Sequence, residues 1–321
     1  MNVSIRPFAV DDYPAILAIR QVVLPEHPAT IEELQHWDAH RDPKCKFARW
    51  VAEMDGQVVA YGSYDQNNGM YHPRRFGVYV AVRPEQQGQG IGSALYEHVM
   101  TALDPFEPLS VRTRARADRL RTLRFLAERG FQESMRDWES RLQVAACDIT
   151  RFSDIHTRVR AQGIVIKTLA ELADDPQRDR KLYELDIEVA EDVPSPEPFT
   201  AWSYEFFAQH VLRSPRLLPD AYFVALLNGA YVGVSVLWSN PDSRNLSTGL
   251  TGVKRSYRRK GIALALKLRA IQLAQAYGAP VVNTWNESNN RPMLSINGQL
   301  GFVKQPASVH LVKLMQQEVV Q

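Results

Sequence analysis

Hydrophobic and polar positions in the first half of the chain alternate with a period of two in some stretches and of about 3.6 in others. These two periods are typical of half-buried strands and of amphipathic helices. The dipeptide Asp55-Gly56 separates two strand-like stretches and is a strong hairpin signal. The pattern predicts strands at 3–8, 48–53, 57–64, 77–82 and 109–113, and helices at 13–24, 93–103 and 120–128.

The second half of the chain repeats this order of elements. Its hairpin signal is Asn228-Gly229, which again lies between two strand-like stretches. The pattern predicts strands at 164–169, 222–226, 231–238, 248–253 and 281–285, and helices at 180–190, 202–212 and 292–300. It also predicts a long helix that follows Ala263 and runs to about Tyr277.

The spacing of landmark residues indicates an internal duplication. Gln87 precedes Gly130 by 43 positions, and Arg258 precedes Gly301 by the same 43. The hairpin glycines lie 31 and 29 positions before Gln87 and Arg258. A chain of 321 residues is also too long for one ordinary core. We therefore expect two tandem domains, at 1–150 and 160–321.

Composition and charge exclude several classes of protein. The chain has 38 basic and 36 acidic side chains, so its net charge of +2 gives no reason to expect a nucleic-acid or membrane partner. No signal peptide or membrane-length apolar run is visible. The two cysteines lack metal-ligand spacing and the eight histidines do not cluster, so we expect no metal and a reducing, cytoplasmic setting.

A glycine-containing turn stands between a strand and a helix in each half. A phosphate group needs several converging backbone N–H groups, which a helix N-terminus supplies together with a favourable dipole. Glycine and alanine leave room for the phosphate to approach. The first turn comprises Gln87, Gly88, Gln89, Gly90, Ile91, Gly92 and Ser93. The second comprises Arg258, Arg259, Lys260, Gly261, Ile262 and Ala263.

Other interpretations of these turns are a plain chain reversal, a dinucleotide-binding fingerprint and a kinase-type P-loop. The dinucleotide fingerprint should follow the first strand of its unit, whereas these turns follow a late strand. The P-loop needs Lys and Ser or Thr directly after its second glycine, and neither turn has them. A pyrophosphate-binding turn and a plain chain reversal are the interpretations that stay open.

The order of elements and the two turns together resemble the GNAT superfamily of acyltransferases. The resemblance covers nearly the whole chain twice and implies a mixed α/β fold, in which each domain is a twisted mixed sheet flanked by helices. It implies acetyl-CoA as cofactor, with its pyrophosphate on the turn. The pantetheine arm would lie along the preceding strand, at Val80 and Val82 in the first copy and at Thr251 and Val253 in the second.

The resemblance assigns the chemistry to the second copy. Many members carry an Asn at the start of the last helix and a Tyr seven residues later, and the corresponding residues here are Asn290 and Asn297. An Asn can donate a hydrogen bond to sulfur but not a proton, so the proton must come from water or another group. The equivalents in the first copy, Arg119 and Leu126, suit neither role. The Asn-rich last helix resembles tandem GNAT proteins related to mycothiol synthase, whose C-terminal copy is regarded as active.

An acidic residue near the acceptor pocket is expected to act as the base. The strand before the second turn contains no acid, and in the family the region between the first two helices borders the acceptor pocket. Glu188 and Asp192 are the acids of this region that we would test first.

The expected function is transfer of an acetyl or short acyl group from acetyl-CoA to a primary amine of a small molecule, directly within a ternary complex. A non-catalytic acyl-CoA sensor and a protein N-acetyltransferase are the alternatives. The sequence leaves the oligomeric state open between monomer and dimer.

Overall fold

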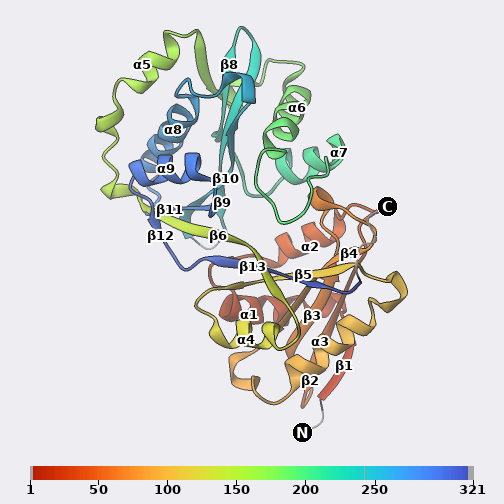
Figure 1. The fold of residues 1–321 in the computed structure, drawn as a ribbon. Helices are drawn as coiled ribbons and strands as arrows, with labels where there is room; N and C mark the ends of the chain where they lie inside the picture. The colour runs from red at the N-terminus through yellow and green to blue at the C-terminus, as the bar shows by residue number, and fades with distance from the viewer. Residues whose placement is uncertain (1–2, 242, 317–321) are drawn as a thin grey trace. The chain divides into compact units, whose positions relative to one another are not determined.

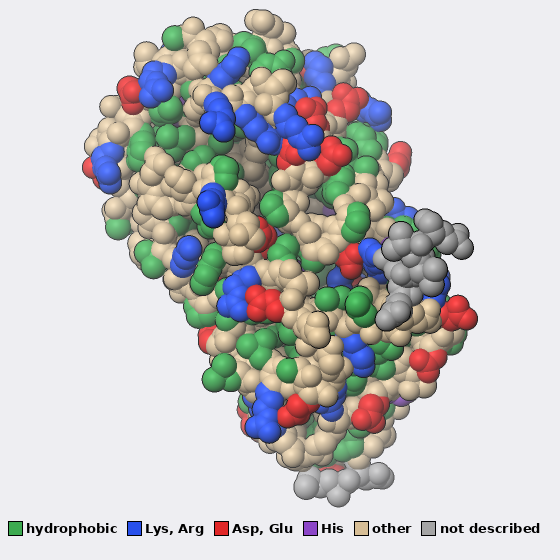
Figure 2. All heavy atoms as spheres, in the orientation of Figure 1, with side chains coloured by type: hydrophobic (Ala, Val, Ile, Leu, Met, Phe, Trp, Pro, Cys, Tyr) green, Lys and Arg blue, Asp and Glu red, His purple; other side chains and the backbone are tan. Residues whose placement is uncertain are grey.

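The structure is a computed structural model that describes residues 3–241 and 243–316. Its contacts divide the chain into two compact units, unit 1 within residues 1–134 and 309–321 and unit 2 within residues 135–308. Basic and acidic side chains are interspersed on the face shown in Figure 2. Among the described helices, none is both long and apolar enough to cross a membrane.

Unit 1 is built on a mixed sheet, which Figure 1 shows in its lower part. In spatial order its strands are β1 (Val3–Pro7), β2 (Phe47–Met54), β3 (Gln57–Asp65), β4 (Arg75–Val82), β5 (Ser110–Arg116) and β13 (Ser308–Leu314). Its α-helices are α1 (Tyr13–Val23), α2 (Ile31–Ala39), α3 (Ile91–Thr101) and α4 (Leu120–Ala127). Strands β1 to β4 pair antiparallel, and β4 pairs parallel with β5.

Helices cover both faces of the unit 1 sheet because neighbouring strand residues point in opposite directions. Val51 and Tyr61 pack in one apolar cluster with the residues of α1. Ala52 and Ala60, which adjoin them in sequence, pack instead with Leu95 of α3. The face that bears α1 and the face that bears α3 are therefore separate environments.

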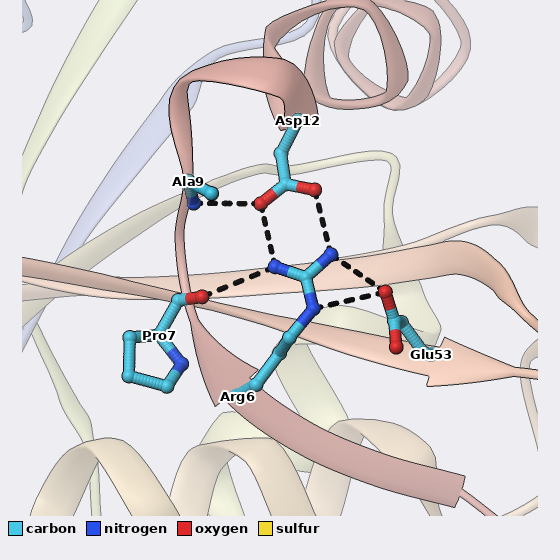
Figure 3. Close-up of polar contacts among 5 residues, drawn as sticks. All are labelled: Arg6, Pro7, Ala9, Asp12 and Glu53. Atoms are coloured by element: carbon cyan, nitrogen blue, oxygen red, sulfur yellow. Dashed lines mark hydrogen bonds and ion pairs between the residues drawn. The ribbon is translucent and has the colours of Figure 1, made fainter.

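Arg6 fixes the start of α1 against the edge of the sheet (Figure 3). Its guanidinium donates to both carboxylate oxygens of Asp12, each at 2.8 Å, and to Glu53 of β2 at 2.6 and 2.9 Å. Asp12 is buried and also accepts from the backbone N–H of Ala9 at 2.7 Å. The ion pair with Arg6 lowers the pKa of Asp12, so these contacts persist at neutral pH.

Unit 2 is a second mixed sheet with helices on both faces. In spatial order its strands are β6 (Gln132–Gln143), β11 (Val281–Glu287), β10 (Ser243–Val253), β9 (Ala230–Asn240), β8 (Leu217–Leu227) and β7 (Ile164–Thr168), and β12 (Val303–Lys304) pairs with β6. Figure 1 shows α6 (Arg178–Ala190) and α7 (Tyr204–Phe207) on one face, and α8 (Ile262–Tyr277) and α9 (Arg291–Gln299) on the other. The short helix α5 (Ile155–Arg160) packs beside α8.

The units differ at their ends from the segments 1–150 and 160–321 expected from the sequence. Strand β6 follows α4 along the chain, yet its residues 137–143 pair with β11 in unit 2. Strand β13 follows α9, yet it lies beside β5, and Val309 and Leu311 join the core of unit 1. Each repeat thus contributes its last strand to the sheet of the other unit, and a division in sequence order does not separate the two cores.

The predicted mixed α/β fold and the order of elements along the chain are present. Helices α2 and α5 and strands β6 and β12 are among the elements that the pattern did not predict. Strand β6 reads Gln-Glu-Ser-Met-Arg-Asp-Trp-Glu-Ser-Arg-Leu-Gln, which is too polar to show a clear period of two. Its partners on both sides come from distant parts of the chain, so its place depends on long-range pairing.

Candidate functional site

Each sheet contains one parallel strand pair that opens along its length. Strands β4 and β5 pair only at Arg75, Phe76 and Gly77, and β10 and β11 pair only at Leu246 and Ser247. Beyond these positions the strands continue without pairing to each other. Backbone groups at the opening are therefore available to a ligand that can form strand-like hydrogen bonds.

The predicted turns lie at the ends of these opened strands and have the same geometry in both copies. Gln87 Nε2 donates to the carbonyl of Val82 at 3.1 Å, and Arg258 Nε donates to the carbonyl of Val253 at 3.0 Å. Gly90 and Gly261 are the N-cap residues of α3 and α8, with φ of 83° and 82°. Both need this left-handed conformation to direct the helix N-terminus toward the turn.

The turns meet the requirements of a pyrophosphate. Neither α3 nor α8 has a side-chain cap, so the N–H groups of the first helical turn have no capping partner within the chain. A Cβ added at Gly90 would meet no atom within 4 Å, so this turn is open. Ile91 and Ile262 are buried beneath the turns and anchor them to the two cores.

The second turn carries more charge and is more constrained. Arg259 stands at the position of Gly88 and adopts φ of 63°, which is strained for a side chain of its size. A Cβ at Gly261 would lie 3.0 Å from Ile155 of α5. Gln162 Nε2 also donates to the carbonyl of Lys260 at 3.2 Å, so the segment after β6 supports one side of this turn.

Asp192, a predicted base, is bound to the second turn. Its carboxylate accepts from Arg255 Nε at 2.7 Å and also contacts Arg258 of the turn. Hydrogen bonding to Arg255 is the main reason that the pKa of Asp192 is lowered. A carboxylate held in this way is a weak base, and its contacts place it as a support for the turn.

Glu188, the other predicted base, is exposed and pairs with Lys254 at 2.9 Å. The acid of α6 with unusual surroundings is Asp186, which is 6% exposed. Burial raises the pKa of Asp186 from 3.8 to about 7, and Tyr222 of β8 lies close to it. Sequence inspection includes Asp186 among the α6 acids but cannot show which of them is buried.

A row of polar side chains lines the α8 face of the opening in unit 2, with Ser235 and Asn297 buried and Thr251 and Asn286 half-buried. Ser235 Oγ and Thr251 Oγ1 lie 2.9 Å apart, and Asn297 Nδ2 donates to Asn286 Oδ1 at 2.6 Å. Asn297 is 2% exposed, and its Oδ1 has no hydrogen-bond partner in the structure. A buried, unpaired amide oxygen is costly unless a ligand satisfies it. The row therefore fits a polar ligand entering between β10 and β11.

Asn290 caps the N-terminus of α9. Its Oδ1 accepts from the backbone N–H of Met293 at 3.4 Å. The side-chain NH2 group is not used in this cap and can serve a ligand. The predicted pair Asn290 and Asn297 thus lies on one helix, one residue at its start and the other in the polar row.

Lys267 of α8 belongs to the same face and was not predicted. It lines a cavity of about 10 Å³ with Ser235 and Thr248 and is 3% exposed. Its Nζ lies 5.1 Å from the ring centre of Phe302 and has no ion pair with any described residue. Burial lowers the pKa of Lys267 from 10.5 to about 8. Only the fold shows that this helical lysine points inward.

We expect Lys267→Met to stabilise the protein at pH 7. The folded state binds fewer protons than the unfolded state between pH 8 and 10.5, so stability rises with pH across this window. The cost of the buried charge is fully present below pH 8, and it amounts to about 3 kcal/mol at most. Urea unfolding should show this gain at pH 7 and none above pH 10.5. An equal gain at both pH values would contradict the buried-charge explanation.

The remaining predicted residues of unit 1 lie around its own opening. Val80 and Val82 pack on the α3 face of β4, and Ser93 accepts a hydrogen bond from Arg129 at 2.8 Å. Arg119 is the N-cap of α4, and Leu126 is buried in the core. Unit 1 therefore has the turn and apolar side chains beside it, but no counterpart of Asn290 and Asn297.

Comparison with known proteins extends this picture. The acetyltransferase (GNAT) family matches residues 9–131 and 178–302. A tandem GNAT protein from the clavulanic acid biosynthesis pathway superposes with a TM-score of 0.74 at 17% identity, covering 99% of this chain and 100% of that one. A GCN5-related N-acetyltransferase from Sphaerobacter thermophilus gives 0.70 at 19% identity, covering 99% and 97%.

Among curated proteins, the N-alpha-acetyltransferase MAK3 of Arabidopsis thaliana is 29% identical over 117 residues. The match covers 36% of this chain and 57% of that relative's length. The two family matches coincide with the two turns and together span more than half of the chain. The chain therefore belongs to the acetyltransferase (GNAT) family, as two tandem copies, and acetyl-CoA is its cofactor.

Proposed function

We propose that unit 2 transfers an acetyl group from acetyl-CoA to a primary amine of a small molecule within a ternary complex. The observation that carries this proposal is the opened β10–β11 pair with its polar row. Asn297 Oδ1 in that row has no partner, so the row is incomplete without a ligand. Strand β10 also contains a bulge between Thr248 and Thr251, and bulges are frequent beside active sites.

Acetyl-CoA, when bound, supplies an activated thioester at the opening. The N–H groups at the start of α8 and the side chain of Arg258 would hold its pyrophosphate, and Thr251 and Val253 would border the pantetheine arm. Lys267 carries a proton at neutral pH, because its pKa is about 8. It can supply the proton that Asn297 cannot donate.

The amine must lose a proton before it can attack. Asp186, with a pKa of about 7, is better suited to accept that proton than Asp192, whose pKa is lowered by Arg255. Glu188 and Asp192 remain predictions for this role. Substitution of Asp186, Glu188 and Asp192 one at a time by the corresponding amide, followed by pH–rate profiles, would distinguish them.

A second candidate is acetylation of protein N-termini. It is favoured by the match to a relative named as an N-alpha-acetyltransferase. A polypeptide acceptor needs an open groove, whereas a small amine needs only a pocket. A non-catalytic acyl-CoA sensor is the third candidate function. It is suggested by the absence of a Tyr at positions 126 and 297.

The test is release of free thiol from acetyl-CoA by the full-length protein, with a panel of small primary amines and a panel of N-terminal peptides. We expect turnover with at least one class of small amine and none with peptides. Turnover with peptides alone would favour protein acetylation. Tight acetyl-CoA binding without turnover on either panel would favour a sensor.

A further inference from the structure

Unit 1 contains a cavity, open to solvent, that the proposed transfer in unit 2 does not use. Its volume is about 240 Å³, and it lies between helices α1 and α2 and strands β2 to β5. Ligand pockets for small molecules begin at roughly 300 Å³, so this cavity suits a compact ligand of a few heavy atoms.

Residues that line the cavity have buried polar atoms with incomplete hydrogen bonding. Arg20 Nε has no hydrogen-bond partner among the described residues, and the hydroxyls of Tyr61 and Tyr79 interact with each other but with no further group. Tyr61 is only 3% exposed, and its ring lies 5.5 Å from that of Tyr79. Buried donors with incomplete hydrogen bonding are costly unless acceptor atoms reach them, and the residues that carry these donors line one small space.

Arg20 and Arg114 have no acidic partner among residues 3–241 and 243–316, although both line the cavity. The other arginines of the cavity, Arg41 and Arg49, are paired with Asp38 at 2.8 Å each. Burial tends to raise the pKa of Asp38, but its contacts with Arg49 and Arg41 lower it overall. The ion pairs therefore persist at neutral pH, and Asp38 is not available to balance the charges of Arg20 and Arg114.

Tyr79 lines the same cavity as these two arginines. Burial and the neighbouring Tyr61 raise its pKa well above 10, so its hydroxyl keeps its proton at neutral pH. The charges of Arg20 and Arg114 act on the pKa of Tyr79 in the opposite direction. The cavity thus offers cations and neutral O–H donors, a combination that matches the two oxygens of a carboxylate.

We infer that unit 1 binds a small carboxylate in this cavity, with Arg20 and the hydroxyls of Tyr61 and Tyr79 as its hydrogen-bond donors. This site is separate from the proposed transfer site and does not depend on it. Asp65, which also lines the cavity and has no ion pair with a described residue, can accept an ammonium group. A plain carboxylate and an amino acid are therefore two sources of the same chemistry.

Isothermal titration calorimetry on the full chain tests this inference without acetyl-CoA and without turnover. The probes are acetate, succinate, glycine and L-glutamate, with succinamide as the uncharged counterpart. We expect at least one carboxylate to bind and succinamide not to bind. Tighter binding of glycine and L-glutamate than of acetate and succinate would identify an amino acid, and the reverse order a plain carboxylate.

Variants locate the site. Arg20→Gln and Tyr79→Phe should each lower the affinity for the carboxylate about tenfold or more, which corresponds to about 1.4 kcal/mol of binding free energy. Arg124→Gln is the matched control, because Arg124 is an exposed arginine of unit 1 that pairs with Glu128. Melting curves verify that each variant is folded. Absence of binding by every carboxylate, equal binding of succinamide, or equal affinity in Arg20→Gln would overturn the inference.

Discussion

Replacing Ala263 by glutamate is expected to lower the rate of acetyl transfer by about 100-fold or more. Ala263 is the second residue of α8, so the new carboxylate stands among the N–H groups that would hold the pyrophosphate. Two like charges 4 Å apart repel by about 4 kcal/mol near a protein surface. An acidic side chain in the first turn of a helix stabilises that helix, so the variant should fold. Thiol release at saturating amine, with acetyl-CoA varied, measures the effect.

Gly92→Glu is the matched control, because Gly92 holds the same position in α3 of unit 1. A Cβ there would lie 3.4 Å from Val82, which is an ordinary contact. We expect Gly92→Glu to keep turnover, and native mass spectrometry should show one bound CoA fewer in each variant. Turnover that is lost in Gly92→Glu and kept in Ala263→Glu would move the chemistry to unit 1 and contradict the proposal.

Asp186→Asn is expected to stabilise the protein by up to about 4 kcal/mol at pH 8. The pKa of Asp186 is about 7 in the folded state and close to 3.8 when the chain is unfolded. Between these values the folded state binds more protons than the unfolded state, so stability falls as pH rises. The amide of Asn does not ionise, so the variant does not lose stability in this way as the pH rises. Urea unfolding should show a gain at pH 8 that disappears below pH 4.

Glu184→Gln on the same helix serves as the control, since Glu184 is exposed and pairs only with Arg180. Its effect should stay within about 0.5 kcal/mol at either pH. A gain in Asp186→Asn that is independent of pH would show that packing, and not the buried charge, is responsible. If Asp186 also accepts the proton of the amine, the stabilised variant should lose turnover, a familiar conflict between stability and activity.

The turns show which parts of the site were predictable. Glycine at positions 90 and 261 is required by a positive φ, and this requirement acts within a few residues. The hairpins at Asp55-Gly56 and Asn228-Gly229 are local in the same way, and both form as predicted. The glycine pattern and the repeated spacing were therefore sufficient to predict the duplication, and their resemblance to the GNAT family implied the fold.

The surroundings of Asp192 and the pairing of strands β6 and β13 depend on long-range contacts, which the sequence pattern did not predict. Asp192 meets Arg258 across 66 residues of sequence, and no local pattern distinguishes it from the exposed Glu188. The exchange of β6 and β13 between the units depends on strand pairing, which the sequence of a polar strand does not specify.

The sequence alone predicted the features that depend on neighbouring residues. The features that depend on burial could be identified only in the folded structure. Turn chemistry and hydrophobic period are properties of neighbouring residues, so they indicated two copies with glycine turns, an arrangement that resembles the GNAT family. The unusual pKa values of Asp186 and Lys267, and the incompletely bonded donors around the cavity of unit 1, arise from side chains that the fold removes from water. Desolvation depends on every element that packs around a group, and for that reason it appears only in three dimensions.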